Sequence, residues 1–175
     1  MDPLDKIIAR AKGLQARAFL SLKKRSEKSH KVCKEVISRI HAGMIVGCYV
    51  SVKDELDTSE ILEYCFANNI TVCVPKVVEN TLQFYKIKSN HDLVPAPFGL
   101  LEPNVTEMIP VQKIDMMIVP LSSYDSKNHR TGYGKGYDSV LSNCINKIGV
   151  AFQEQEVDQI DVESHDITLD EIISA

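Results

Sequence analysis

The sequence predicts an α/β protein, with helices on both faces of a mostly parallel sheet in a three-layer α/β/α arrangement. Apolar runs at 44–50, 70–74 and 114–120 alternate with segments whose apolar residues recur every three or four positions. A continuous apolar run is typical of a strand buried on both faces, and the longer period indicates an amphipathic helix. The length of 175 residues predicts a single domain spanning 1–175.

Composition limits the class of protein. With 44% hydrophobic and 25% charged residues, the chain has the composition of a soluble globular protein and not of a disordered one. No apolar run approaches the ~20 residues of a membrane helix, and the start lacks the features of a signal peptide, so we expect a cytoplasmic protein. The five cysteines show no Cys-x-x-Cys spacing, which predicts neither a disulfide framework nor a zinc site.

The charge is unevenly placed. The net charge of −4 argues against a nucleic-acid partner. Residues 1–35 carry ten Lys or Arg, whereas residues 154–175 carry eight Asp or Glu and no Lys or Arg. From charge alone we expect two solvated faces of opposite sign.

The first two predicted elements are helices. Between residues 4 and 14 the helical period predicts a buried face made of Leu4, Ile7, Ile8, Ala11 and Leu14. Lys6 and Arg10 lie one turn apart on the same helix. Ser26 or Ser29 is expected to cap the second helix, which Gly43 ends and whose buried stripe consists of Val32, Val36, Ile37 and Ile40.

The middle of the chain alternates between strands and helices. After the strand at 44–50, Asp57 and Glu60 have the spacing of a capping box for a helix that ends at Asn68-Asn69. A short strand at 70–74 is expected to end before Pro75. Residues 82–87 alternate as a strand, and the proline-rich stretch 89–110 predicts a long irregular connection.

The last part of the chain leads from a buried strand into a polar segment. The strand at 114–120 is followed by a glycine-rich stretch at 122–136 and a short helix at 137–144. A strand at 148–152 and a weak one near 171–173 complete the predicted sheet. In such a fold, ligand sites are expected at the carboxyl ends of the strands.

The clearest chemical signal lies between a predicted strand and a predicted helix. Segment 130–138 reads Arg-Thr-Gly-Tyr-Gly-Lys-Gly-Tyr-Asp, with alternate glycines that let backbone N–H groups approach an anion. The N-terminus of the following helix adds positive charge, so the segment suits phosphate, with Arg130 and Lys135 as counter-charges. Asp138 suits Mg²⁺, which prefers carboxylate oxygen. Neither the Walker nor the Rossmann pattern is present, and taken alone the glycines are equally typical of a flexible turn.

At this point the chain resembles the 5-formyltetrahydrofolate cyclo-ligase (5,10-methenyltetrahydrofolate synthetase) family over nearly its whole length. Segment 130–138 is similar to that family's Arg-x-Gly-Tyr/Phe-Gly-x-Gly-Tyr-Tyr-Asp loop. Four further matches follow the family's order: Lys6-x-x-x-Arg10, Tyr49 to Thr58, Gly99-Leu100-Leu101-Glu102-Pro103, and Ala151 to Asp166. The resemblance implies a NagB/RpiA/CoA-transferase-like fold.

The resemblance also implies a reaction and its site. In it, ATP phosphorylates the formyl oxygen of 5-formyltetrahydrofolate, N10 attacks the activated carbon, and phosphate leaves to give 5,10-methenyltetrahydrofolate. The implied ATP-binding residues are Lys6, Arg10, Arg130, Gly132, Gly134, Lys135, Gly136 and Tyr137. The implied folate-binding residues are Val50, Glu55, Tyr133, Gly134, Lys135, Gly136 and Tyr137. The implied catalytic residues are Arg130, Lys135 and Glu55, and the implied Mg²⁺ ligands are Asp138 and Asp166. With folate and ATP as ligands, we expect a monomer with no membrane or nucleic-acid partner.

Two departures from the family pattern leave other hypotheses open. Leu121 stands where the family usually has Gly, and Tyr137-Asp138 lacks one tyrosine of Tyr-Tyr-Asp. The alternatives are a catalytically impaired folate or nucleotide binder, and an unrelated phosphate-loop domain. At single positions, Lys6 and Arg10 are also compatible with a solvated helix face, and Glu55 with a solvated loop. Asp166 has several acidic neighbours in the sequence, and only alignment with the family pattern selects it among them.

Overall fold

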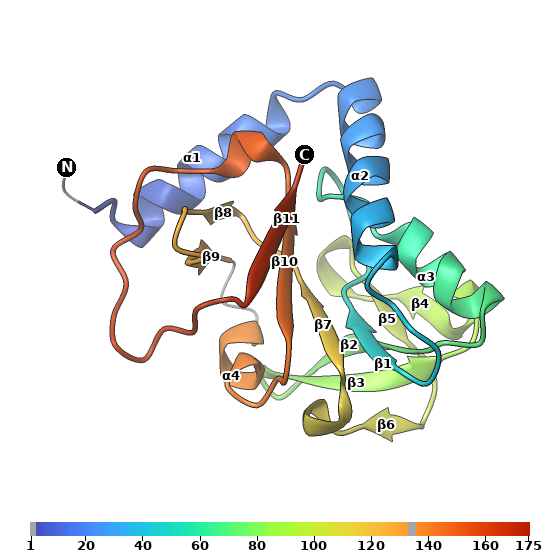
Figure 1. Ribbon diagram of the computed structural model, residues 1–175. Coiled ribbons are helices and arrows are strands. Elements are labelled where there is room, and N and C mark those ends of the chain that lie inside the picture. Colours follow the sequence, from blue (N-terminus) through green and yellow to red (C-terminus); the bar gives the residue numbers. More distant parts are fainter. Residues whose placement is uncertain (1–2, 133–135) are drawn as a thin grey trace.

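The computed structural model describes residues 3–132 and 136–175, and within them the central element is a seven-stranded sheet in the order β11-β10-β7-β1-β2-β3-β6 (Figure 1). Its strands are β1 (Ile45–Cys48), β2 (Thr71–Val78), β3 (Thr81–Ile87), β6 (Met108–Ile109), β7 (Met116–Val119), β10 (Lys147–Ala151) and β11 (Glu171–Ser174). The pairings from β11 through β10, β7 and β1 to β2 are all parallel, and β3 and β6 extend the sheet in antiparallel fashion. The predicted mostly parallel α/β fold is confirmed.

Strand β2 continues past the point at which we expected it to end. Pro75 lies inside the strand, opposite Phe84 of β3. On its other side β1 pairs with β2 only as far as Cys73, so the rest of β2 is an edge. A residue without an N–H is tolerated at an edge, and Pro75 therefore does not end the strand.

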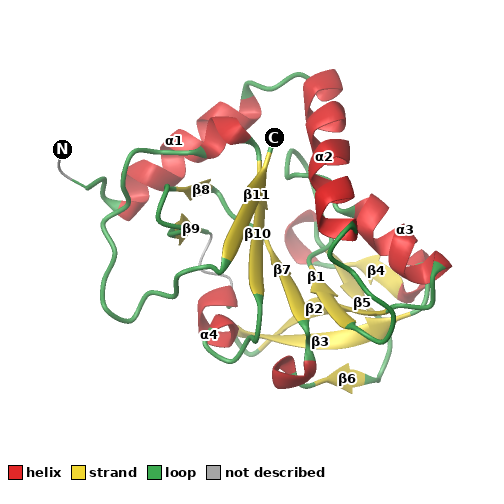
Figure 2. Cartoon of the chain, in the orientation of Figure 1, coloured by secondary structure: helices red, strands yellow, loops and turns green. Residues whose placement is uncertain are grey.

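Helices cover both faces of the sheet (Figure 2). The helices are α1 (Lys6–Ala18), α2 (Leu22–Ile37), α3 (Ser59–Ala67) and α4 (Tyr137–Leu141). The ring of Phe84 in β3 meets Tyr137 of α4 edge-on, with centroids 6.3 Å apart. Register puts Phe84 on the face of the sheet that Gly47 of β1 shares, whereas Cys48 points to the opposite face, where its neighbours include Cys33 of α2 and Cys65 of α3. The predicted three layers are therefore present.

Helix α1 buries a different face from the one we predicted. Its buried residues are Ala9, Gly13 and Arg17, whereas Ile7 and Ile8 are 71% and 50% exposed. The helix packs on the backbone of a hairpin formed by β8 (Ser123–Tyr124) and β9 (Arg130–Thr131). A close approach to backbone needs small residues in the contact, and for this reason the small face turns inward.

The predicted N-terminal caps of α2 and of α3 are also wrong. Helix α2 begins at Leu22, where the Ser21 hydroxyl accepts a hydrogen bond from Lys24 N at 3.1 Å, so neither Ser26 nor Ser29 is its cap. Ser29 is buried, and its hydroxyl accepts from Asp57 N instead.

The capping box predicted for α3 does not form. The Asp57 carboxylate accepts from Ser59 N at 2.9 Å, and the residue at the cap position is Thr58. Glu60 lies 2.7 Å from the imidazole Nδ1 of His30 on α2, so its carboxylate joins two helices and does not close a cap.

The segment 89–110 is more regular than we predicted. It contains β4 (Leu93–Pro95), β5 (Leu101–Pro103) and β6, with 3-10 turns at Asn90–Asp92 and Pro97–Gly99. The strands have three residues or fewer, which is too short for an alternating pattern to identify. A third 3-10 turn, Val111–Lys113, leads into β7, and a fourth, Gln153–Gln155, follows β10.

The oppositely charged ends of the chain lie against each other, which differs from the two separate solvated faces that we expected (Figure 1). Two ion pairs join them, Lys6 with Asp166 at 2.5 Å and Lys28 with Glu154 at 3.0 Å, and Arg39, just beyond the basic segment, pairs with Glu171 at 2.7 Å. All five cysteines are buried free thiols. None of the described helices is long and apolar enough to cross a membrane.

Replacement of Gly13 by Ala tests how α1 is seated. A Cβ at Gly13 would overlap the carbonyl oxygen of Ser122 and lie 2.7 Å from Ser123 Cβ. Gly to Ala in a helix ordinarily adds about 0.5–1 kcal/mol of stability, but here we expect a loss of about 1–3 kcal/mol from overpacking. Urea unfolding measures the difference, with Gln15→Ala on the exposed side of α1 as the control. A Gly13→Ala variant more stable than the wild type would contradict this packing.

Candidate functional site

The candidate site lies where β7 and β10 end, around the β8–β9 hairpin. Beyond Val119 at the end of β7, the chain passes through Pro120 and Leu121 into the hairpin, and α4 begins at Tyr137. Helix α1 packs on the hairpin from outside (Figure 1). The site therefore combines the first helix, the carboxyl ends of two neighbouring strands and the start of the last helix.

Arg130 is the most enclosed charge of this site. Its side chain is 6% exposed, and its guanidinium donates to Asp138 Oδ1 at 3.1 Å and to the Pro120 carbonyl at 3.3 Å. The guanidinium carbon lies 6.0 Å from the centre of the Tyr137 ring. Burial lowers the pKa of Arg130, and the neighbouring Asp138 carboxylate opposes that shift. Because a Cβ on Gly132 would overlap this guanidinium, the glycine is required for Arg130 to fold back over its own strand.

Two cations of α1, Lys6 and Arg10, contact opposite sides of the same region. Arg10 Nε donates to the Gly132 carbonyl at 2.6 Å. One turn earlier, Lys6 Nζ donates to Asp166 Oδ2 at 2.5 Å. Arg10 thus holds the residue over which Arg130 folds, and Lys6 holds the acidic segment. The structure in this way brings together Lys6, Arg10, Arg130, Gly132, Asp138 and Asp166, which the sequence spreads over 160 positions.

Asp166 is a charged acceptor at the edge of the site. Burial raises the pKa of its carboxyl group, but the N–H of Glu163, at 2.7 Å, and the Lys6 ammonium outweigh that effect, so the pKa is lowered. The Asp138 side chain is 76% exposed and presents its carboxylate to Arg130. Each of the two carboxylates therefore faces one cation of the site.

These two carboxylates fit the chemistry of magnesium. Mg²⁺ is commonly held by one or two carboxylates together with the phosphates of a nucleotide, and it needs no dedicated cage. Within residues 3–132 and 136–175, no three His, Cys, Asp or Glu side chains are grouped closely enough to hold a metal ion alone. Asp138 and Asp166 each offer the carboxylate oxygen that Mg²⁺ takes beside a phosphate ligand.

A second group of predicted residues lies on the loop after β1. Val50 is half-buried, and Glu55 accepts from Val52 N at 2.8 Å inside the same loop. Burial raises the pKa of Glu55, while the Val52 N–H and the nearby Arg17 oppose the rise. A carboxyl group with a raised pKa beside a buried arginine is typical of functional sites.

Tyr137 links this group to the Arg130 region. Its ring is buried against Phe84, and burial, followed by the charges of Cys48 and Glu55, raises the pKa of its hydroxyl well above the usual value. The Tyr137 hydroxyl and Arg130 Nε are buried polar atoms without a hydrogen-bond partner in the described part of the chain. Unpaired buried polar atoms are rare, and two neighbouring ones indicate a place where a polar ligand is to be received.

Three predicted site residues, Tyr133, Gly134 and Lys135, lie outside the described residues. Gly136, which follows them, has φ +101° and is the N-cap of α4. This left-handed backbone favours glycine, and a Cβ there would lie 3.0 Å from Leu82 Cγ. The glycine at 136 is thus explained by the turn into α4 alone.

Sequence reasoning missed residues that hold the site in place. Arg17 is buried, and both its Nε and its terminal nitrogen lie within 3.1 Å of Asp54 Oδ1, beside Glu55. Its position one turn beyond Gly13 on the small-residue face was the available signal. Asp125 is buried with His129 as its partner at 2.9 Å, and we had not selected either residue.

Leu121, the first departure from the family pattern, is buried against β10. A Cβ built on Gly149 would lie 3.1 Å from Leu121 Cδ2 and 2.6 Å from Leu169 Cδ1. The Leu121 side chain therefore occupies space that Gly149 leaves free.

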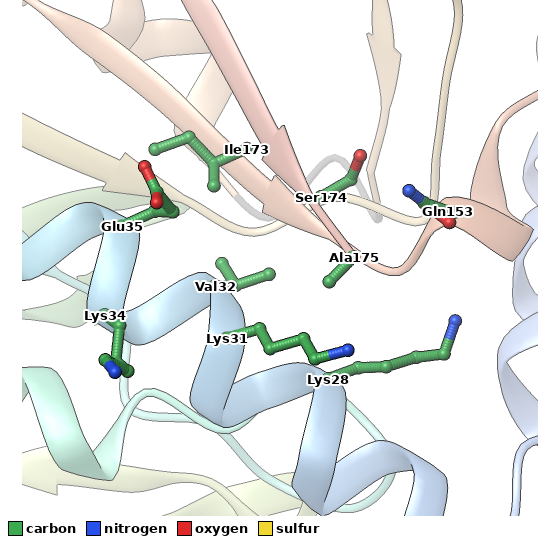
Figure 3. A pocket seen from close by; sticks show the side chains of 9 residues that line it. All are labelled: Lys28, Lys31, Val32, Lys34, Glu35, Gln153, Ile173, Ser174 and Ala175. Carbon is green, nitrogen blue, oxygen red and sulfur yellow. The ribbon is translucent and has the colours of Figure 1, made fainter.

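A separate cavity of about 520 Å³ lies between α2 and β11 (Figure 3). It is lined by Lys28, Lys31, Val32, Lys34, Glu35, Gln153, Ile173, Ser174 and Ala175. No predicted site residue lines it, so it is distinct from the candidate site.

Comparison with known proteins gives one family. The model of the 5-formyltetrahydrofolate cyclo-ligase family matches residues 5–175. The chain is 29% identical to the 5-formyltetrahydrofolate cyclo-ligase of Haemophilus influenzae, over 73% of this chain and 74% of that protein. It is 27% identical to the enzyme of the same name from Mycoplasma pneumoniae, over 98% and 99% of the two chains.

Solved structures give the same result. The 5,10-methenyltetrahydrofolate synthetase of Aquifex aeolicus superposes with a TM-score of 0.85 at 28% identity, over 97% of this chain and 89% of that one. The synthetase of Mycoplasma pneumoniae superposes with a TM-score of 0.78 at 25% identity, over 97% and 98%.

Removal of the unpaired Tyr137 hydroxyl is expected to stabilise the ligand-free protein. An unsatisfied buried polar group costs about 1–3 kcal/mol, so Tyr137→Phe should raise the free energy of unfolding by about 1 kcal/mol. Tyr49→Phe is the matched control, because the buried Tyr49 hydroxyl donates to Leu56 O at 2.9 Å and its loss should destabilise. Urea unfolding of both variants measures the two signs. A destabilised Tyr137→Phe protein would mean that the hydroxyl is already paired.

Glu55→Gln is expected to change the pH dependence of stability. Because the pKa of Glu55 is raised from 4.5, the folded protein binds this proton more tightly than the unfolded chain does. The stability that Glu55 contributes is therefore complete below about pH 4.5 and is lost as the pH rises through the folded value. Relative to the wild type, Glu55→Gln should gain stability as the pH rises from about 4.5 to 8. Urea midpoints across that range test this, with Glu79→Gln in an exposed turn as the control, and a difference independent of pH would count against it.

Proposed function

The chain belongs to the 5-formyltetrahydrofolate cyclo-ligase family, and we propose that it catalyses the ATP- and Mg²⁺-dependent conversion of 5-formyltetrahydrofolate to 5,10-methenyltetrahydrofolate, releasing ADP and phosphate. It acts as a single-domain monomer spanning 1–175. The observation that carries the proposal is the convergence of Lys6, Arg10, Arg130, Asp138 and Asp166 at the carboxyl ends of β7 and β10.

The cations are proposed to bind the triphosphate of ATP. Charge builds on the transferring phosphoryl group, so catalysis requires positive groups that are fixed before the reaction begins. Arg130 meets this requirement, since its side chain is 6% exposed and its two terminal nitrogens are already held. Lys6 and Arg10 lie on the helix that packs on the hairpin. Gly132, Gly134, Lys135 and Gly136 complete the proposed phosphate site.

Asp138 and Asp166 are proposed to hold Mg²⁺ together with the nucleotide phosphates. When bound, the ion neutralises charge on the phosphate oxygens. In the ligand-free protein each carboxylate faces a cation, Arg130 or Lys6. The Lys6 ammonium helps to lower the pKa of Asp166, and Arg130 holds the Asp138 carboxylate at the start of α4.

The folate is proposed to lie beside Glu55 and Tyr137. Val50, Tyr133 and Tyr137 line the pterin side, and Glu55 hydrogen-bonds the formyl-bearing edge. The formyl oxygen attacks the γ-phosphorus of ATP and ADP leaves. N10 then forms a bond to the formyl carbon and loses its proton to solvent or to the departing phosphate, and the bond between that carbon and the phosphorylated oxygen breaks. The phosphate released carries the formyl oxygen.

The direct test follows the absorbance of methenyl-folate when purified protein is mixed with 5-formyltetrahydrofolate, Mg²⁺ and ATP. We expect an ATP-dependent rise, and a loss of about 10²–10³-fold in kcat when the charge on Asp166 is removed in Asp166→Asn. Asp161→Asn, an exposed acid of the same segment, is the control and should keep the wild-type rate. No rise with ATP in the wild type would refute the proposed activity.

A catalytically impaired binder is the second candidate, because Tyr137-Asp138 lacks one tyrosine of the family motif. The contact between Asp138 and Arg130 supports an active enzyme, since it gives Asp138 a position at the start of α4 in spite of the missing residue. Insertion of a tyrosine between residues 137 and 138 separates the two candidates. Activity that appears only after insertion, with folate already raising the melting temperature of the wild type, would favour the impaired binder.

A further inference from the structure

We propose that Asp125 is a positioning residue that fixes the positions of Asp166, Lys6 and Arg130 relative to one another. The inference rests on the proposed function for its effect on ATP, but its structural basis is independent of any ligand. Asp125 opens the turn between β8 and β9, and it is 1% exposed. Asp125 is not among the residues that we propose to bind the phosphates, the metal or the folate.

The Asp125 carboxylate accepts four hydrogen bonds. Its Oδ1 accepts from Lys127 N and from His129 N, both at 3.0 Å. Its Oδ2 accepts from His129 Nδ1 at 2.9 Å and from Ile160 N at 3.0 Å. Three of these bonds fix the turn that leads directly into Arg130. The fourth reaches the acidic segment 35 positions further along the chain.

The acidic segment is attached to this hairpin on both sides of Asp166. Before it, Val157 N donates to Tyr124 O at 2.8 Å and Ile160 N donates to Asp125. After it, Leu169 N donates to Asn128 O at 3.0 Å. Asp166 therefore lies on a loop whose two ends are held by residues 124–128. The position of its carboxylate follows from the shape of that turn.

The start of α1 is attached at the same point. Leu4 N donates to Gln159 O at 2.6 Å, and Asp161 N donates to Leu4 O at 2.8 Å, so Leu4 pairs with the backbone on both sides of Ile160. Lys6, two residues later, meets Asp166. Ile160 is thus the junction between the helix that carries Lys6 and the segment that carries Asp166, and its N–H is held by Asp125.

Only a carboxylate satisfies this arrangement. Four N–H donors converge on two oxygens, and each oxygen accepts two of them. An asparagine has one acceptor oxygen and one NH₂ group, so in either orientation its NH₂ faces a backbone N–H, that of Ile160 on one side or those of Lys127 and His129 on the other. A buried donor that loses its acceptor is destabilised, and the junction at Ile160 should then loosen.

The test compares Asp125→Asn with Asp115→Asn. Asp115 Oδ2 accepts a single backbone N–H, from Ile45 at 2.8 Å, at the opposite end of the sheet, and an amide oxygen can replace it there. Amide hydrogen exchange of the ligand-free proteins is followed at Ile160 and Leu169, and ATP binding is measured by calorimetry without metal. KM is measured for ATP and for 5-formyltetrahydrofolate.

We expect Asp125→Asn to speed exchange at Ile160 and Leu169 by about tenfold or more and to weaken ATP binding and raise its KM by a similar factor. The KM for the folate should stay within about twofold, because Glu55 and Tyr137 lie outside these contacts. Asp115→Asn should leave the exchange rates, the affinity for ATP and the KM values for ATP and for the folate at their wild-type values. A role in general stability alone would raise both KM values together. Wild-type exchange at Ile160, or wild-type ATP binding, in Asp125→Asn would overturn the proposal.

His129 provides a second test if Asp125→Asn does not fold. His129→Leu removes one donor from Oδ2 and leaves the backbone contacts, so exchange at Ile160 and the dissociation constant for ATP should rise several-fold. His129→Asn returns an N–H near the same place and should restore both. Unchanged values in His129→Leu would contradict the proposal. Because exchange and ATP binding need no turnover, they remain decisive even if the protein does not convert the folate.

Discussion

The arrangement of the site depends on the close approach of α1 to the backbone of the β8–β9 hairpin. Gly13 allows the helix axis to come so near that a single methyl group would overlap Ser122 O. From this contact Arg10 and Lys6 of the helix reach Gly132 and Asp166 with ordinary side-chain lengths. A helix held further out would leave both cations in solvent. Because the helix buries its small-residue face, the apolar side chains of Ile7 and Ile8 are left exposed on another face.

Two of the cations of the site face a carboxylate before any ligand arrives. Arg130 is paired with Asp138 and Lys6 with Asp166, whereas Arg10 donates to the Gly132 carbonyl. An unpaired charge at such a place would be costly, whereas exchange of one anionic partner for another keeps the balance. A triphosphate entering the site would therefore compete with carboxylates for the same cations, and the carboxylates released from them would face the metal.

Much of the fold follows from local patterns, and the failures have physical reasons. The strands at 45–48, 116–119 and 147–151 were predicted because burial on both faces needs continuous apolar sequence. The face of α1 was mispredicted because small residues against backbone, and not large apolar ones, make its contact. The pairing of Lys6 with Asp166 spans 160 positions and is invisible to spacing rules, so only family resemblance placed both residues in one site. Asp125 was missed because a buried acid in a turn carries no periodic signal. Arg17 continues the four-residue spacing of Ala9 and Gly13, but a charged residue was not expected on a buried face.

The contact between Leu121 and Gly149 has a consequence for how this chain and its relatives vary. The space between the end of β7 and the middle of β10 has room for one side chain. In this chain Leu121 fills that space, and Gly149 has no side chain there. Because interiors are packed to the density of crystals, a relative with glycine at the first position needs a larger residue at the second, or a shift of Leu169, to fill the same space. The two positions are thus expected to covary across an alignment of the family. The leucine at 121 fills space that the glycine at 149 leaves open, so the core accommodates its side chain.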